Sequence, residues 1–150
     1  MTSCYVAFSH GANDVANAVA PVAVVISIAW KEVDAIYLLA FGGIGIALGI
    51  LTWGYKVIKT VGGRITALTN TRGFSVDFAA ATVVLVASKL GLPISTSHAV
   101  VGAVIGVGLA RGLEAIDLSI IKKIIYSWLL TLPSTAILSI LIYSGLTILF

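Results

Sequence analysis

Two long apolar runs without a charged residue constrain this chain more than any other feature. Residues 35–55 and 124–150 contain no Asp, Glu, Lys or Arg. A membrane helix needs about 20 apolar residues to cross roughly 30 Å of hydrocarbon, and both runs meet that length. Of the 150 residues, 59% are hydrophobic and only 10% are charged, whereas about a quarter of a soluble domain is charged. The composition excludes a soluble enzyme, a disordered tail and a nucleic-acid-binding domain, and predicts a multi-pass protein of the cell membrane.

Two further apolar segments are interrupted. Residues 5–30 contain Asn13, Asp14 and Asn17, which predicts a helix with a polar break. Residues 74–110 are too long for one helix and contain Gly91-Leu92-Pro93 in the middle. Two helices of about 15 residues, each about 22 Å long, would meet at this bend without crossing the membrane. We therefore expect an all-α membrane bundle with a discontinuous helix and a re-entrant helical hairpin; two ordinary spans over 74–110 are the alternative.

The loops between these segments predict an orientation. The loops 56–72 and 111–123 are rich in Lys and Arg, whereas the turn 31–34 has one base and two acids. Cytoplasmic loops carry an excess of Lys and Arg, so the two basic loops are expected in the cytoplasm. A hairpin over 74–110 enters and leaves on that same side, and two full spans satisfy the pattern equally.

Glycine and proline predict how the helices pack and bend. Gly45 with Gly49, and Gly102 with Gly106, form pairs of small residues four apart, which in membranes usually mark close helix packing. Pro133 lies inside the run 124–150, where it removes a backbone donor and predicts a kink.

The first polar cluster is formed by Asn13, Asp14 and Asn17. On a helix these residues share a face, so one carboxylate and two amides would converge. Oxygen ligands of this kind suit a hard cation. The alternative is a helix cap, because Asn and Asp are favoured at helix N-termini. A charge inside a membrane segment is usually functional, which favours the cation site.

The second cluster is Ser95, Thr96 and Ser97, directly before an apolar run. Their hydroxyls and the free N–H groups of a first helical turn would form an anion site. The alternative is that one residue caps the helix and the others are idle.

Three other residues carry weaker signals. Asp77 is expected at the start of the first hairpin helix, where it either complements the dipole or serves as a second cation ligand or proton carrier. His10 and His98 are expected to be hydrogen-bonded rather than metal ligands, because no Cys or carboxylate lies at a metal-site spacing from them. Lys89 either reaches an interface or lines the transport path, and the sequence does not separate these roles.

Residues 10–18 (HGANDVANA) and the block from 73–77 (GFSVD) to 91–102 (GLPISTSHAVVG) resemble the signatures of the inorganic phosphate transporter (Pit) family. Residues 63–66 (GRIT) and 131–133 (TLP) fit the same family. The resemblance implies a cation-coupled phosphate symporter built from two inverted halves. Residues 1–150 would form a single half, the C-terminal one. Its partners would be phosphate, lipid and either a second inverted half or further copies of the chain.

The resemblance also implies roles for the residues singled out above. Phosphate would contact Ser95, Thr96 and Ser97, with Asn13 and Asp14 at the centre of the site. The coupling ion, either Na⁺ or H⁺, would use Asn13, Asp14, Asn17 and Asp77, although the family often has Glu at the position of Asp77. His10 and His98 would lie along the transport path. No cofactor other than a coupling Na⁺ is expected.

Three alternatives remain at this point. Hydroxyls and backbone amides also fit sulfate. A structural membrane subunit would not need two polar clusters at membrane depth. A hydrolase built from Ser95 or Ser97, His98 and Asp14 lacks a Gly-x-Ser-x-Gly elbow, and Ser97 and His98 point to different helix faces.

Overall fold

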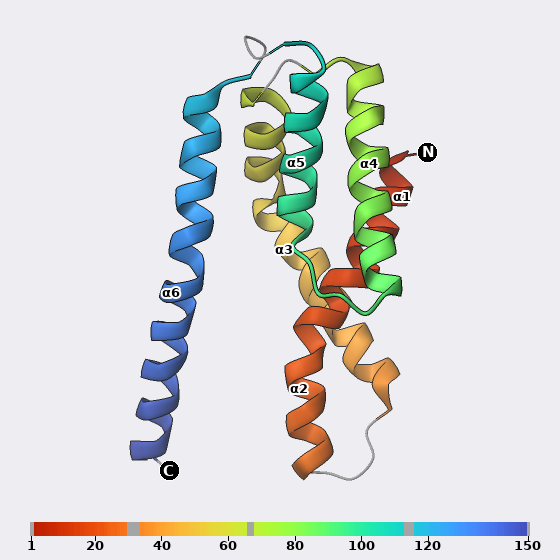
Figure 1. Cartoon of the computed structure of the whole chain (residues 1–150). Helices are drawn as coiled ribbons and strands as arrows, with labels where there is room; N and C mark the ends of the chain where they lie inside the picture. The colour runs from red at the N-terminus through yellow and green to blue at the C-terminus, as the bar shows by residue number, and fades with distance from the viewer. Residues whose placement is uncertain (1, 30–33, 66–67, 113–115, 150) are drawn as a thin grey trace. The chain divides into compact units, whose positions relative to one another are not determined.

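The computed structural model describes residues 2–29, 34–65, 68–112 and 116–149, and these residues form helices and no strands. In chain order they are α1 (Thr2–His10), the π-helical turn η1 (Gly11–Val15), α2 (Ala16–Ala29), α3 (Ala35–Arg64), α4 (Asn70–Lys89), α5 (Thr96–Leu109) and α6 (Leu118–Leu149) (Figure 1). The all-α fold class is confirmed.

Four helical stretches are long and apolar enough to cross a membrane: Thr2–Ile28, Ala35–Lys59, Asn70–Lys89 and Leu118–Ile148. Their large apolar side chains point outward; Phe41, Leu51 and Ile148 are 80%, 81% and 84% exposed. Side chains of this kind are stable in contact with lipid and not with water. The chain is therefore a multi-pass membrane protein.

The chain divides into two compact units, residues 1–116 and 117–150. The second unit contains α6, which begins at Leu118 rather than at residue 124. The reason is a helix cap: the Asp117 carboxylate accepts from the backbone N–H groups of Ser119 at 2.9 Å and Ile120 at 3.3 Å. Pro133 lies inside this helix, which continues to Leu149.

The polar break predicted within 5–30 is a widened helical turn. α1 leads through the π-helical turn η1 into α2, so the chain stays helical where Asn13 and Asp14 occur. A π-turn is wider than an α-turn and changes which side chains share a face; such turns often occur at functional sites. The break thus alters the directions of the polar side chains without ending the span.

The helix expected over 35–55 extends to Arg64 as α3, because Lys favours helix and the basic residues after Tyr55 do not end it. α3 packs closely on the broken helix at Gly42. A methyl group at Gly42 would lie 2.6 Å from Val19 Cγ2 and 3.3 Å from Val15 Cγ1. The prediction for the two glycine pairs is wrong within the described residues, since a methyl group at Gly45, Gly49, Gly102 or Gly106 would meet nothing within 4 Å.

α4 and α5 form the helical hairpin expected over 74–110, although α4 begins earlier, at Asn70. The helices are unequal, with 20 and 14 residues. At 1.5 Å per residue α5 is about 21 Å long, which is less than the roughly 30 Å of a full crossing. α4, with 20 residues, is long enough for a crossing, so the re-entrant hairpin stays a prediction.

The turn of the hairpin is a Schellman motif. Gly91 adopts a φ of +69°, its N–H donates to the Ser88 carbonyl at 3.1 Å, and the Leu92 N–H donates to the Ala87 carbonyl at 2.9 Å. Pro93 then keeps the chain extended until α5 begins. Residues 90–96, which include the first residue of α5, therefore form a defined tip, which is called the hairpin tip below.

The hairpin packs on α1 through small and aromatic side chains. Its core includes Val76, Ala80 and Val84 of α4 and Val104 of α5, all buried. The Tyr5 ring lies 6.1 Å from the Phe78 ring, and the Tyr5 and Thr82 hydroxyls are 3.3 Å apart. This packing runs α4 alongside α1 and brings the hairpin tip to η1 (Figure 1).

Candidate functional site

Asp14 lies where the broken helix meets the hairpin. Its Oδ2 accepts a hydrogen bond from Thr96 Oγ1 at 2.9 Å and faces His10 Nε2 at 2.6 Å. Its Oδ1 accepts from Asn13 Nδ2 at 2.7 Å. The carboxylate thereby joins α1, η1 and the first turn of α5. A charged group in a membrane segment requires such partners, because an unpaired one is costly to bury.

Asn13 makes the second link to the hairpin tip. Its side chain is 3% exposed, and its Nδ2 also donates to the Ile94 carbonyl at 2.8 Å. Ile94 belongs to the irregular backbone between α4 and α5, where a carbonyl has no helical partner. The amide of Asn13 therefore satisfies a backbone group that would otherwise be unpaired inside the membrane.

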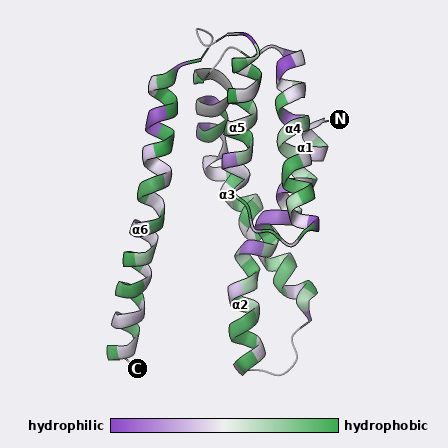
Figure 2. Ribbon diagram, viewed as in Figure 1, coloured by the Kyte–Doolittle hydropathy of each residue, from purple (hydrophilic) through white to green (hydrophobic). Residues whose placement is uncertain are grey.

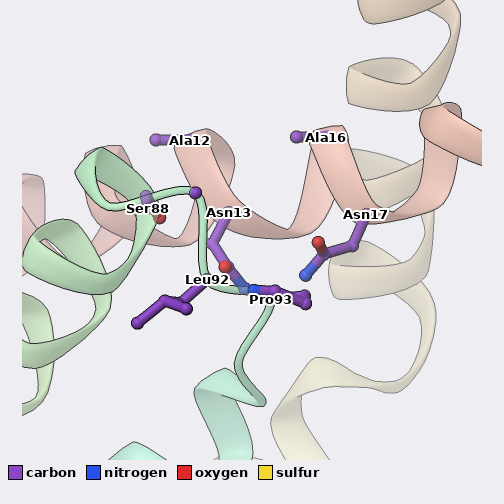
Figure 3. A pocket seen from close by; sticks show the side chains of 8 residues that line it. Ala12, Asn13, Ala16, Asn17, Ser88, Leu92 and Pro93 are labelled. Atoms are coloured by element: carbon purple, nitrogen blue, oxygen red, sulfur yellow. The ribbon is translucent and has the colours of Figure 1, made fainter.

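A pocket of about 270 Å³ opens beside this contact. Figure 3 shows the side chains of Asn13 and Asn17 pointing toward Pro93. The lining residues come from the broken helix and the hairpin: Ala12, Asn13, Ala16, Asn17, Ser88, Gly91, Leu92 and Pro93. The amides line the pocket, whereas Asp14 is not a lining residue. The prediction that Asn13, Asp14 and Asn17 share one helix face is therefore wrong for Asp14, because the π-turn directs this side chain to Thr96.

The three hydroxyl residues have three different surroundings. Ser95 is the N-cap of α5, and its Oγ accepts from the His98 backbone N–H at 3.3 Å. Thr96 donates to Asp14. Ser97 is exposed and makes no hydrogen bond through its side chain within the described residues. The cap interpretation therefore holds for Ser95, whereas the anion site stays a prediction.

Two predicted residues lie apart from this contact. Asp77 lies within α4, which begins at Asn70, so its expected place at the helix start is wrong. It is half-buried and is not a lining residue of the pocket. His98 lies in the first turn of α5 and is exposed; its backbone N–H donates to Ser95 Oγ.

Some of the site was not predicted from the sequence. The Ile94 carbonyl and Ser88 were missed, although Gly91-Leu92-Pro93 had marked the bend that exposes them. No group of three or more His, Cys, Asp or Glu side chains that could hold a metal ion occurs among the described residues.

The contact lies halfway along a spanning helix. Asn13 and Asp14 occupy the middle of the stretch Thr2–Ile28, and Figure 2 shows hydrophilic residues gathered there between apolar helices. Broken helices and hairpin tips that meet at half depth form the substrate sites of many secondary transporters. The fold and the site together resemble those of membrane transporters.

The comparison with known proteins specifies the family. Residues 1–139 match the model of the phosphate transporter family, and the chain belongs to this family. It is 57% identical over 99% of its length to a Pyrococcus furiosus protein named "Putative phosphate permease PF1020", of which it covers 38%. It is 48% identical over 94% of its length to the Arabidopsis thaliana protein "Inorganic phosphate transporter 2-1, chloroplastic", of which it covers 25%.

A solved structure agrees with the fold. "The sodium-dependent phosphate transporter" matches 90% of this chain with a TM-score of 0.76 and 58% sequence identity, and the chain covers 35% of it. The chain thus spans 25% to 38% of the length of these proteins, so one half of a transporter fits its size.

Proposed function

We propose that this chain forms one half of a cation-coupled symporter of inorganic phosphate. The observation that carries the proposal is the contact of Asp14 and Asn13 with the hairpin tip at the middle of a membrane span. It joins a carboxylate, amides and hydroxyls in one place, next to a pocket. Membership of the phosphate transporter family supports phosphate as the substrate.

The coupling cation is assigned to the Asp14 carboxylate in this contact. Oδ1 of Asp14 accepts one hydrogen bond within the described residues, which leaves room at that oxygen for an ion. The amide oxygens of Asn13 and Asn17, which line the adjacent pocket, are ligands of the same hard type. We assign the coupling ion to these three side chains, with Asp77 as a second carboxylate on the path.

The anion is assigned to the first turn of α5. Ser97, the first-turn N–H groups of α5 and the helix dipole would hold phosphate, while Ser95 and Thr96 fix the start of the helix. His10 belongs to the site through its contact with Asp14, and His98 shares the first turn of α5.

Electrostatics explains why the two ligands would bind together. Phosphate and Asp14 are both negative, and two unit charges 4 Å apart repel by about 4 kcal/mol at an effective dielectric constant of 20. A cation at Asp14 removes most of this repulsion. Phosphate then binds well only after the cation, which is the thermodynamic basis of symport.

Sodium is the coupling ion that we favour over protons. The solved neighbour at 58% identity is named as sodium-dependent, and the oxygen-rich, cysteine-free ligand set is compatible with Na⁺. A transported proton would instead have to reside on Asp14 or Asp77.

The test is uptake of labelled phosphate by proteoliposomes that contain the assembled transporter. An inward Na⁺ gradient and an inward pH gradient are imposed separately, with unlabelled phosphate or sulfate as competitor. We expect accumulation with Na⁺ and competition by phosphate alone. Accumulation driven only by the pH gradient would mean that the coupling ion is H⁺ and not Na⁺. Equal competition by sulfate would mean that the transporter does not select phosphate over sulfate.

A further inference from the structure

Lys89 is a cation at the end of α4, level with the middle of the span Thr2–Ile28, and it has no partner within the described residues. It lies in the last turn of α4, directly after the pocket residue Ser88 and before the hairpin tip. The tip is bonded to Asn13 and Asp14, which lie halfway along the span Thr2–Ile28. The Lys89 side chain is exposed, and it makes no hydrogen bond or ion pair within the described residues.

A role as a helix cap does not explain this lysine. Basic residues often serve the last carbonyls of a helix. Here the Schellman motif already satisfies them, because Val86, Ala87 and Ser88 accept from the N–H groups of Leu90, Leu92 and Gly91. Lys89 therefore has no carbonyl to serve in the final turn of α4.

A position at the interface does not explain it either. Half of the hydrocarbon layer is about 15 Å thick, and the four-carbon stem of a lysine is much shorter than that. From the level of the hairpin tip the ammonium group cannot reach the headgroups. A charge held at this depth needs an opposite charge or a water-filled path.

The carboxylate at the tip is already engaged. Asp14 contacts His10, Asn13 and Thr96, and it forms no ion pair with Lys89. The anion that completes the pairing must come from outside the described residues. In a transporter of phosphate, the one anion certain to pass this level of the membrane is the substrate.

We propose that the Lys89 ammonium is a direct electrostatic contact for phosphate on the transport path, at the end of α4 next to the Ser88–Pro93 side of the pocket. This inference rests on the proposed function. Lys89 would offset the charge of phosphate as the anion reaches the hairpin tip, and thereby lower its KM. Lys89 would not bind the coupling ion, because the ammonium group and the ion are both positively charged.

The first test compares three variants of the assembled transporter in Na⁺-driven phosphate uptake. Lys89→Met keeps the length of the side chain and removes the charge, Lys89→Arg keeps the charge, and Lys122→Met on α6 is the control. We expect Lys89→Met to raise the phosphate KM by about 10- to 100-fold, the range expected for loss of one hydrogen bond to a charged group. Lys89→Arg should stay near the parent value, and the Na⁺ dependence should remain.

A second measurement needs no variant. Amine acylation of the parent protein, followed by mass spectrometry, reports the reactivity of each lysine with and without phosphate. We expect phosphate to protect Lys89 and not Lys122.

The outcomes separate the inference from the proposed function. An unchanged KM in Lys89→Met, or no protection of Lys89 by phosphate, overturns the role of Lys89 while leaving phosphate symport intact. A variant with lower thermal stability and an unchanged KM would mean that Lys89 pairs with a protein carboxylate, which also overturns it. Failure of the parent protein to take up phosphate would instead contradict the proposed function.

Discussion

At the scale of single residues, the account depends on how the carboxylate of Asp14 is used. Oδ2 contacts both Thr96 and His10, whereas Oδ1 accepts only from Asn13 within the described residues. Hydrogen-bond donors therefore reach both oxygens of the carboxylate. The asymmetry leaves Oδ1 as the oxygen that a cation can approach.

The three hydroxyl residues should respond differently to alanine, because their partners differ. Ser95→Ala should lower the stability by about 1 kcal/mol, as expected for a lost helix cap, with little change in phosphate KM. Ser97→Ala should raise the KM and leave the melting temperature unchanged. The triple alanine variant should raise the KM strongly without abolishing binding, since the backbone N–H groups remain.

Melting temperature and KM, measured on the same single and triple variants, check this assignment. If the triple variant binds phosphate normally and only melts earlier, the hydroxyls merely fix the start of α5.

At the scale of elements, the sequence predicted which segments are helical but not the residues at which some helices begin and end. Charge-free runs predicted the spans, and Gly91-Leu92-Pro93 predicted the bend of the hairpin. The end of α3 was missed because Lys56 and Lys59 can continue a helix as well as mark a loop. The start of α4 was missed because the polar residues from Asn70 to Arg72 look like loop residues in a sequence.

The residues of this contact could be predicted from the sequence, whereas the directions of their side chains could not. Asn13, Asp14 and Thr96 were singled out, yet nothing in the spacing indicates a π-turn at Gly11–Val15. A regular α-helix would have directed Asp14 with Asn17 to one side. The bond from Asn13 to the Ile94 carbonyl joins residues 81 positions apart, and such contacts depend on tertiary packing that local patterns do not encode.

The contact of α3 with the broken helix gives a prediction at this scale. Gly42→Ala places a methyl group 2.6 Å from Val19 Cγ2, and overpacking of this kind typically destabilises by about 1–3 kcal/mol. The matched control is Gly43→Ala, where a methyl group meets nothing within 4 Å. Thermal unfolding in detergent should show a lower Tm for the first variant alone.

Val19→Ala combined with Gly42→Ala should restore part of the lost stability, because it removes the methyl group that the new one meets. A Gly42→Ala protein as stable as the Gly43→Ala control would show that α3 does not pack closely on α2.

At the scale of the whole molecule, the chain covers 38% of a curated relative and 35% of a solved transporter. Half-depth polar contacts such as that between η1 and the hairpin tip are stable only where protein or a water-filled cavity surrounds them. Ser97 and Lys89 are both exposed here, and under the proposed function we expect a second, inverted half to cover them.

We accordingly expect that the purified 150-residue chain does not accumulate phosphate in proteoliposomes, and that addition of an inverted second half restores uptake. Crosslinking in the same vesicles reports the assembly state. Gradient-driven uptake by a chain that crosslinks only as a monomer would contradict the requirement for a second half; uptake by an antiparallel dimer would satisfy it.

The most direct test of the central claim is Na⁺-driven uptake by Asp14→Asn in the assembled transporter. This substitution keeps the shape of the side chain and removes the charge that would hold the cation. Thr96→Val is the matched comparison, because it removes one hydrogen bond to Asp14 and keeps the charge. We predict that Asp14→Asn no longer concentrates phosphate, whereas Thr96→Val still couples uptake to Na⁺ with a raised KM. Concentrative uptake by Asp14→Asn at the parent rate would contradict the account.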